Sequence, residues 1–144
     1  ACDVSILADG VYIGTGTVTT GGGLTISRPA LSISVGLPYT PRVVLAAPEV
    51  ASQGGTTQGQ QLSTHEIMVR FLDTASCTVN GEPVPFRSFD TASTLDNAPP
   101  TFTGKVAVGG LGWAKGESDI TISQPYPYPW TVLAVIRSLS ANQG

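Results

Sequence analysis

His65 is the only histidine of the chain, and it is the first residue to test for acid–base or nucleophilic chemistry. Ser63 lies two residues before it, which in a strand places both side chains on one face. A serine hydrolase also needs an acid that orients the histidine, and many place the serine in a Gly-x-Ser-x-Gly turn, which this chain lacks. The sequence therefore favours an ordinary strand histidine, and we assign no catalytic residue.

The residue spacing does not indicate a metal or cofactor site either. Asp90, Asp96 and Asn97 offer oxygen ligands of the kind calcium prefers, but not in the order of a calcium-binding loop. Zinc would need three or four Cys, His or carboxylate ligands together, and no such cluster can be placed. The glycine groups at 14–16 and 109–112 open no helix, so they provide no helix N-terminus for a phosphate. We expect no metal, no cofactor and no small-molecule substrate.

Aromatic side chains are the remaining candidates for a binding site. Residues 124–130 alternate proline with aromatics, and an apolar run follows. Proline fixes φ and lacks an N–H, so this segment predicts a stiff, extended strap outside any sheet interior. Tyrosine and tryptophan can stack on sugars or bases, but they are also enriched where subunits meet. We favour packing or subunit contact, and the predicted interface residues are Tyr39, Trp113, Tyr126, Tyr128 and Trp130.

The composition is typical of an all-β protein. The chain has 144 residues with 17 glycines, 11 prolines, 41% hydrophobic and only 12% charged residues. This length allows a real core, and many glycines and prolines indicate many turns. Charge this sparse also suggests that other subunits cover part of the surface.

The net charge is −3, and the 7 basic residues are scattered without a basic stripe. Tight binding of phosphate groups is therefore not expected. Two cysteines, Cys2 and Cys77, make no disulfide framework, and free thiols are favoured over a pair.

Turn signals and alternation predict the elements. Asp9-Gly10 and Asn80-Gly81 each mark a tight hairpin, because both turn positions need a positive φ. Residues 31–35 alternate strictly, which places three aliphatic side chains on a predicted core face; residues 66–72 alternate in the same way around Ile67, Val69 and Phe71. The run 132–136 predicts a strand covered on both faces, and 49–63 predicts a long loop. The aliphatic residues of the first of these strands are Leu31, Ile33 and Val35.

These elements predict an all-β fold of roughly eight to ten short strands with long loops and little or no helix. The expected architecture is a multi-stranded antiparallel β-sandwich or barrel-like arrangement of sheets. We expect one β-rich domain over residues 1–144, with a possible subdivision near the 48–63 loop.

The order of these features resembles the tail tube (nozzle) protein of short-tailed bacteriophages, the tail tubular protein B type. The resemblance spans most of the chain, and its most specific parts are the Val-Gly-Leu-Pro-Tyr element and the Pro-x-Pro-x-x-Val-Leu-Ala-Val-Ile ending. The matching stretches are Asp9-Gly10, Leu24-Thr25-Ile26, the serine-alternating strand, Val35-Gly36-Leu37-Pro38-Tyr39, Thr57-Gln58-Gly59-Gln60, Ile67-Met68-Val69-Arg70-Phe71, residues 104–108, Ile120-Thr121-Ile122 and residues 127–136.

The resemblance implies a structural component of the virion tail, assembled in the cytoplasm of the host bacterium. Such proteins form a homo-oligomeric ring, usually hexameric, that contacts the adaptor and portal side and other tail proteins. The ring is a conduit for DNA ejection, and DNA passes without tight binding. The family contributes no catalytic residues. The chain begins at Ala1 rather than Met, and the resemblance implies that it is the C-terminal portion of a longer protein.

The alternative function is a carbohydrate-binding or adhesin-type β-sandwich module that uses exposed aromatics. An aromatic surface that disappears on oligomerisation favours the tail protein, whereas an aromatic face left open on a monomer favours the binding module. A hydrolase ranks third, because no acid–base pair can be placed.

Overall fold

The structure is a computed structural model, and it describes residues 1–46, 48, 51–52, 55–56, 61–86, 97–110, 113–114 and 119–142. All regular structure in these ranges is β-strand in antiparallel pairs, so the predicted all-β fold is confirmed. The sheets do not close into a barrel. The strands are β1 (Cys2–Ala8), β2 (Val11–Val18), β3 (Ile33–Gly36), β4 (Arg42–Leu45), β5 (Ala51–Ser52), β6 (Gly55–Thr56), β7 (Gln61–Thr74), β8 (Thr78–Val79), β9 (Glu82–Pro83), β10 (Phe102–Gly109), β11 (Trp113–Ala114), β12 (Ile120–Ser123) and β13 (Val132–Asn142).

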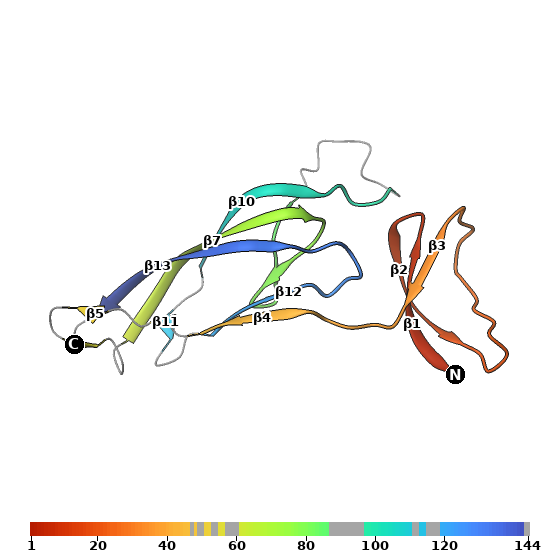
Figure 1. The fold of residues 1–144 in the computed structure, drawn as a ribbon, viewed down its shortest axis with the longest axis horizontal. Helices are drawn as coiled ribbons and strands as arrows, with labels where there is room; N and C mark the ends of the chain where they lie inside the picture. Colours follow the sequence, from red (N-terminus) through yellow and green to blue (C-terminus); the bar gives the residue numbers. More distant parts are fainter. Residues whose placement is uncertain are drawn as a thin grey trace.

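A three-stranded sheet in the order β2-β1-β3 lies at one end of an elongated molecule (Figure 1). Its first two strands form the predicted hairpin, and Asp9 and Gly10 have φ values of 52° and 80°. Asp9 also fixes the third strand, because its Oδ1 accepts hydrogen bonds from the backbone N–H groups of Leu31 (3.0 Å) and Ser32 (2.8 Å). The turn therefore positions two neighbouring strands at once.

The edge strand β3 corrects one prediction. Leu31, Ile33 and Val35 were expected to face a core, but their exposed fractions are 102%, 46% and 46%. Ile33 pairs with Ala8 and Val35 pairs with Ile6, and these two residues of β1 are buried. The strand β3 therefore continues the apolar face of β1, but its own part of that face is exposed. The alternation was identified correctly, but among the described residues nothing buries it.

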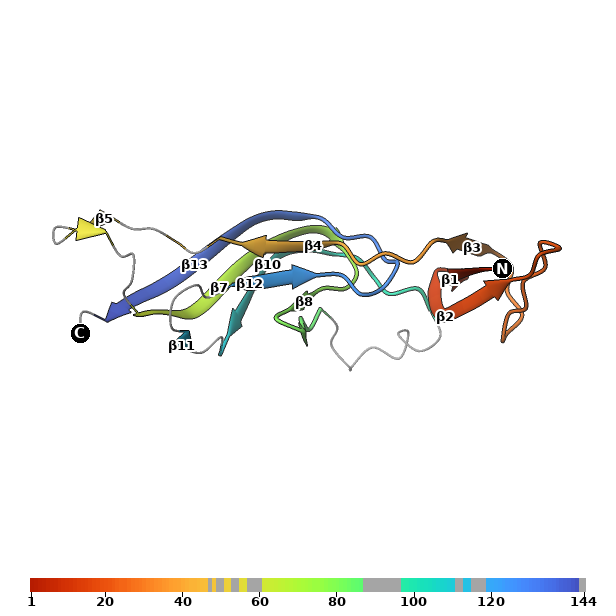
Figure 2. The same ribbon diagram turned by 90° about the horizontal axis from the view of Figure 1, so that it is seen from below.

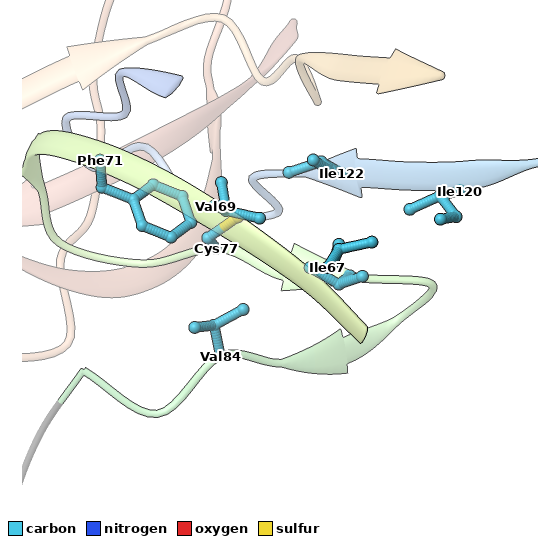
Figure 3. Close-up of a cluster of buried hydrophobic side chains, with 8 residues drawn as sticks. Ile67, Val69, Phe71, Cys77, Val84, Ile120 and Ile122 are labelled. Carbon is cyan, nitrogen blue, oxygen red and sulfur yellow. The ribbon is translucent and has the colours of Figure 1, made fainter. Parts of the chain in front are cut away.

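Two larger sheets form a sandwich. In one, β7 is central, with β13 along one side and β10 and β11 along the other; the second has the order β4-β12-β8-β9. Figure 2 shows the two layers from a second direction. Their facing side chains form the core, and Figure 3 shows those of β7 and β12 meeting there. The core residues are Ile67, Val69, Phe71, Cys77, Val79, Val84, Ile120 and Ile122.

The structure confirms the predicted buried face of β7 but not the predicted burial of β13. Ile67, Val69 and Phe71 are fully buried, as the alternation predicts. The prediction that 132–136 is covered on both faces is wrong, because Leu133 and Ile136 are 51% and 60% exposed. An apolar run shows that a strand is compatible with burial on both faces, but here only one second layer exists to cover it.

The predicted 49–63 loop is partly outside the described residues. Within the described part, Ala51–Ser52 pairs with Gly55–Thr56 and β7 already begins at Gln61, so the loop is shorter at its C-terminal end than predicted. A single domain, and its subdivision near this segment, remain predictions. No helix in the described part is long and apolar enough to span a membrane.

Thr74 ties the end of β7 to the start of β13. Its fully buried hydroxyl accepts a hydrogen bond from the Thr131 N–H at 3.0 Å and lies 3.1 Å from the carbonyl oxygens of Leu72 and Thr131. Thr74→Val keeps the shape but leaves the Thr131 N–H without its acceptor, so we expect the free energy of unfolding to fall by about 1–3 kcal/mol. Urea denaturation measures it, with the exposed Thr101→Val as the control; equal small losses in both would contradict the role.

Candidate functional site

The strap at 124–130 and the N-terminal sheet enclose a cavity of about 720 Å³. Three parts of the chain build its walls: β1 and β2, the link at 37–41, and the strap that joins β12 to β13. The cavity therefore lies where the N-terminal sheet meets the sandwich. Sites between packed units are among the common positions for ligand binding.

The strap is less extended than predicted. The Tyr128 N–H donates to the Tyr126 carbonyl at 2.8 Å, which closes a three-residue turn. This turn has a physical reason, because β12 and β13 belong to opposite sheets and the chain must reverse across the end of the sandwich. The prediction that prolines keep the strap outside the sheets is confirmed.

The tyrosines of the strap meet the N-terminal hairpin directly. The Tyr128 hydroxyl accepts a hydrogen bond from the Tyr12 N–H at 2.9 Å. The rings of Tyr12 and Tyr126 have centroids 5.6 Å apart, and those of Tyr126 and Tyr128 are 6.1 Å apart. Such tilted aromatic contacts are favourable beyond the area they bury. Residues more than a hundred positions apart in the sequence thus form one aromatic wall.

Gln124 anchors the beginning of the strap. Its side chain is 1% exposed, and its Nε2 donates to the Ser76 carbonyl at 2.7 Å. Its Oε1 accepts from the Tyr126 N–H at 3.3 Å, and its backbone N–H donates to the Pro41 carbonyl at 3.1 Å. A buried amide with partners on both sides is strongly specified, because each lost partner leaves a polar group unsatisfied. Gln124 therefore fixes the strap relative to the link.

Trp130 closes the site from the core side. It is half-buried and packs against the core cluster. Its buried indole N–H has no oxygen acceptor among the described residues and approaches the thiol of Cys77, a weak acceptor. Burial raises the pKa of the Cys77 thiol above its ordinary value of 9.0, and the Trp130 N–H and the Thr78 backbone oppose this rise to a smaller extent.

This shift predicts a loss of stability at alkaline pH. Because the folded-state pKa of Cys77 is raised, the thiol contributes stability that is fully present below pH 9.0 and is lost as the pH rises through the folded-state value. We expect the free energy of unfolding by urea to fall more steeply above about pH 9 in the wild type than in Cys77→Ala. Parallel pH profiles of the two proteins would contradict this assignment.

The two cysteines are unpaired, as favoured from the sequence, with Cys77 buried and Cys2 exposed. A second cavity of about 300 Å³ lies on the other side of the strap, between Tyr126, Tyr128 and the 75–77 and 83–86 segments. The strap tyrosines therefore separate two hollows, and the larger one alone is in contact with the N-terminal sheet.

Four of the five predicted interface residues lie together. Tyr39, Tyr126, Tyr128 and Trp130 line the larger cavity, whereas the side chain of Trp113 lies outside the described residues. Gln124 and Tyr12, which also line the cavity, were not among the predicted interface residues. No local pattern shows that these two residues join the site, since only the topology brings β2, the link and the strap together.

The residues considered for catalysis and metal binding do not assemble into a site within the described part. His65 is exposed, and the described ranges contain no group of three or more His, Cys, Asp or Glu residues arranged for a metal ion. Asn97 is exposed, and Asp90 and Asp96 lie outside the described residues.

Comparison with known proteins does not add a family. No protein-family model matches the chain, and no curated protein matches it.

Proposed function

We propose that this protein is a self-associating structural subunit of a short bacteriophage tail, in which a ring of identical chains forms the tail tube or nozzle. The proposal includes no catalytic step. It combines the order of sequence elements described above with the surface of the N-terminal sheet. In the virion, the ring would contact the adaptor side and other tail proteins and would let DNA pass during ejection.

The observation that carries the proposal is the exposed apolar alternation along 31–39. Leu31, Ile33, Val35, Leu37 and Tyr39 are exposed by 102%, 46%, 46%, 71% and 81%. Such a pattern is typical of a strand with one buried face, and natural edge strands are usually protected by charges or covered. The intervening residues Ser32, Ser34, Gly36 and Pro38 bring no charge to the segment.

Burial of this segment by a second copy would supply the driving force for assembly. Each large aliphatic side chain gains about 1.5–3 kcal/mol when it moves from full exposure to full burial. The free energy gained by burying several such residues on one face exceeds the conformational entropy that their side chains lose at an interface. The segment therefore supports a permanent rather than a transient contact.

The sparse basic charge is consistent with a conduit through which DNA passes without tight binding. The basic residues are few and scattered, so no continuous series of phosphate contacts can form along the sequence. DNA affinity that comes from phosphate contacts falls steeply as the salt concentration is raised. A conduit needs neither high DNA affinity nor this salt dependence.

Negative-stain imaging and light scattering of the purified chain at micromolar concentration test the proposal. We expect closed rings with a central opening and a single mass that is an integral multiple of the chain mass. A homogeneous monomer at every concentration would contradict the proposal. Open filaments would contradict the ring while retaining self-association.

A further inference from the structure

Every tyrosine of the chain lines one cavity. The chain has 4 tyrosines, Tyr12, Tyr39, Tyr126 and Tyr128, and all of them are wall residues of the cavity between the N-terminal sheet and the strap. Trp130 adds a fifth ring. Packing alone does not account for this gathering, because Tyr39 is 81% exposed and Tyr126 is 46% exposed.

None of the described residues that line this cavity has a charged side chain. Beside the aromatic and proline rings, the lining includes the hydroxyl-bearing residues Ser5, Thr15 and Thr40. The volume of about 720 Å³ lies within the range of natural ligand sites. The complementary ligand is therefore neutral, has apolar faces that stack on rings, and has many hydrogen-bonding groups around its edges.

These requirements separate the possible ligands. A nucleic acid has bases that stack, but its phosphates need cations, and the lining contains no lysine or arginine among the residues that the structure describes. An acidic or basic peptide is disfavoured for the same reason. A neutral saccharide meets each requirement, because its pyranose rings have apolar C–H faces and a rim of hydroxyl groups. We propose that this cavity binds a neutral oligosaccharide, with Tyr39 and Tyr126 as the stacking platforms.

The supporting walls are held in place before any ligand arrives. The hydrogen bond from the Tyr12 N–H fixes the Tyr128 hydroxyl at 2.9 Å, and Gln124 holds the strap to the Ser76 carbonyl. Prolines at 38, 41, 125, 127 and 129 limit the backbone of the link and the strap. A wall that is already ordered binds without an ordering cost, so modest contacts suffice for measurable affinity. This saccharide site goes beyond the proposed tail-tube function. It shares Leu37 and Tyr39 with the 31–39 segment, so a second copy that covers this segment and a sugar in the cavity would compete for the same surface.

Isothermal titration calorimetry of the chain with maltohexaose, cellohexaose and chitohexaose, three neutral hexasaccharides, tests the site. We expect saturable binding of at least one of them, and Tyr126→Ala and Tyr39→Ala should each weaken it about tenfold, whereas Tyr126→Phe should retain it because the ring remains. Leu133→Ala changes an exposed residue of β13 that is not among the lining residues; it is the control and should bind as the wild type does.

Two further measurements make the result decisive. The affinity should not change when salt is raised, since the described lining residues carry no charge. A variant with Leu31→Lys, designed to weaken self-association, should bind the sugar at least as tightly as the wild type, because a second copy no longer competes for Tyr39; this separates failure of this site from failure of the proposed function. Absence of saturation with all three sugars, equal binding by the wild type and both alanine variants, or loss of binding with salt would each overturn the proposal.

Discussion

Phe71→Ala should lower the free energy of unfolding by about 3–5 kcal/mol, the largest effect of any single substitution considered. Phe71 is fully buried between the two sheets, and its ring meets Phe86 edge-on with centroids 5.0 Å apart. Phe86 in turn lies 5.3 Å from Phe102, so removal of the first ring loosens a row of three. Because domains of this size are stable by only about 5–15 kcal/mol, the loss is a large part of the total.

Leu72→Ala is the matched control for this prediction. Leu72 is the next residue of β7, lies on the opposite face and is 40% exposed, so its truncation should cost less than about 1 kcal/mol. Chemical denaturation of both variants gives the comparison. Equal losses would contradict the assignment of the buried face of β7 and with it the packing of the two sheets.

The second large effect is expected on self-association. Leu31→Lys combined with Val35→Lys should weaken the assembly at least about thirtyfold, since it removes roughly 2–4 kcal/mol of apolar burial and introduces like charges. The fold should be retained, because both side chains are already exposed and a lysine stem can cover the same surface. Sedimentation velocity across a dilution series measures the change.

A control with the same added charge distinguishes the apolar face from a general effect of charge. Thr25→Lys combined with Ser27→Lys places two lysines on exposed positions of the same N-terminal sheet region. This variant should assemble as the wild type does. If both double variants lose the assembly equally, the face of 31–39 is not the contact.

Local chemistry explains which parts of the fold the sequence predicted. The Asp9-Gly10 and Asn80-Gly81 turns were predictable because these residues accept positive φ, and all four adopt it. The alternation in β7 was predictable because Ile67, Val69 and Phe71 face a sheet that exists within the same chain. In each case the residues that decide the structure are adjacent in sequence.

The incorrect predictions share a different cause. Alternation in 31–35 shows that one face is apolar but not what covers it, so the exposure of Leu31 required the topology. The turn in the strap depends on where β12 and β13 lie in space, which proline chemistry does not determine. Similarly, the residues after Gln124 predict the strap but not the partner of the Gln124 side chain, because Ser76 lies 48 residues away.

Hydrogen–deuterium exchange of the 31–39 segment tests the central claim, that a second copy covers this apolar face, most directly. Exchange of its backbone amides should be faster in dilute solution, where only contacts within one chain protect them, and should slow as the concentration rises into the assembling range, while the exchange of β7 stays unchanged. The Leu31→Lys and Val35→Lys double variant should show no such slowing. Identical exchange of 31–39 in the monomer and in the assembly would contradict the claim.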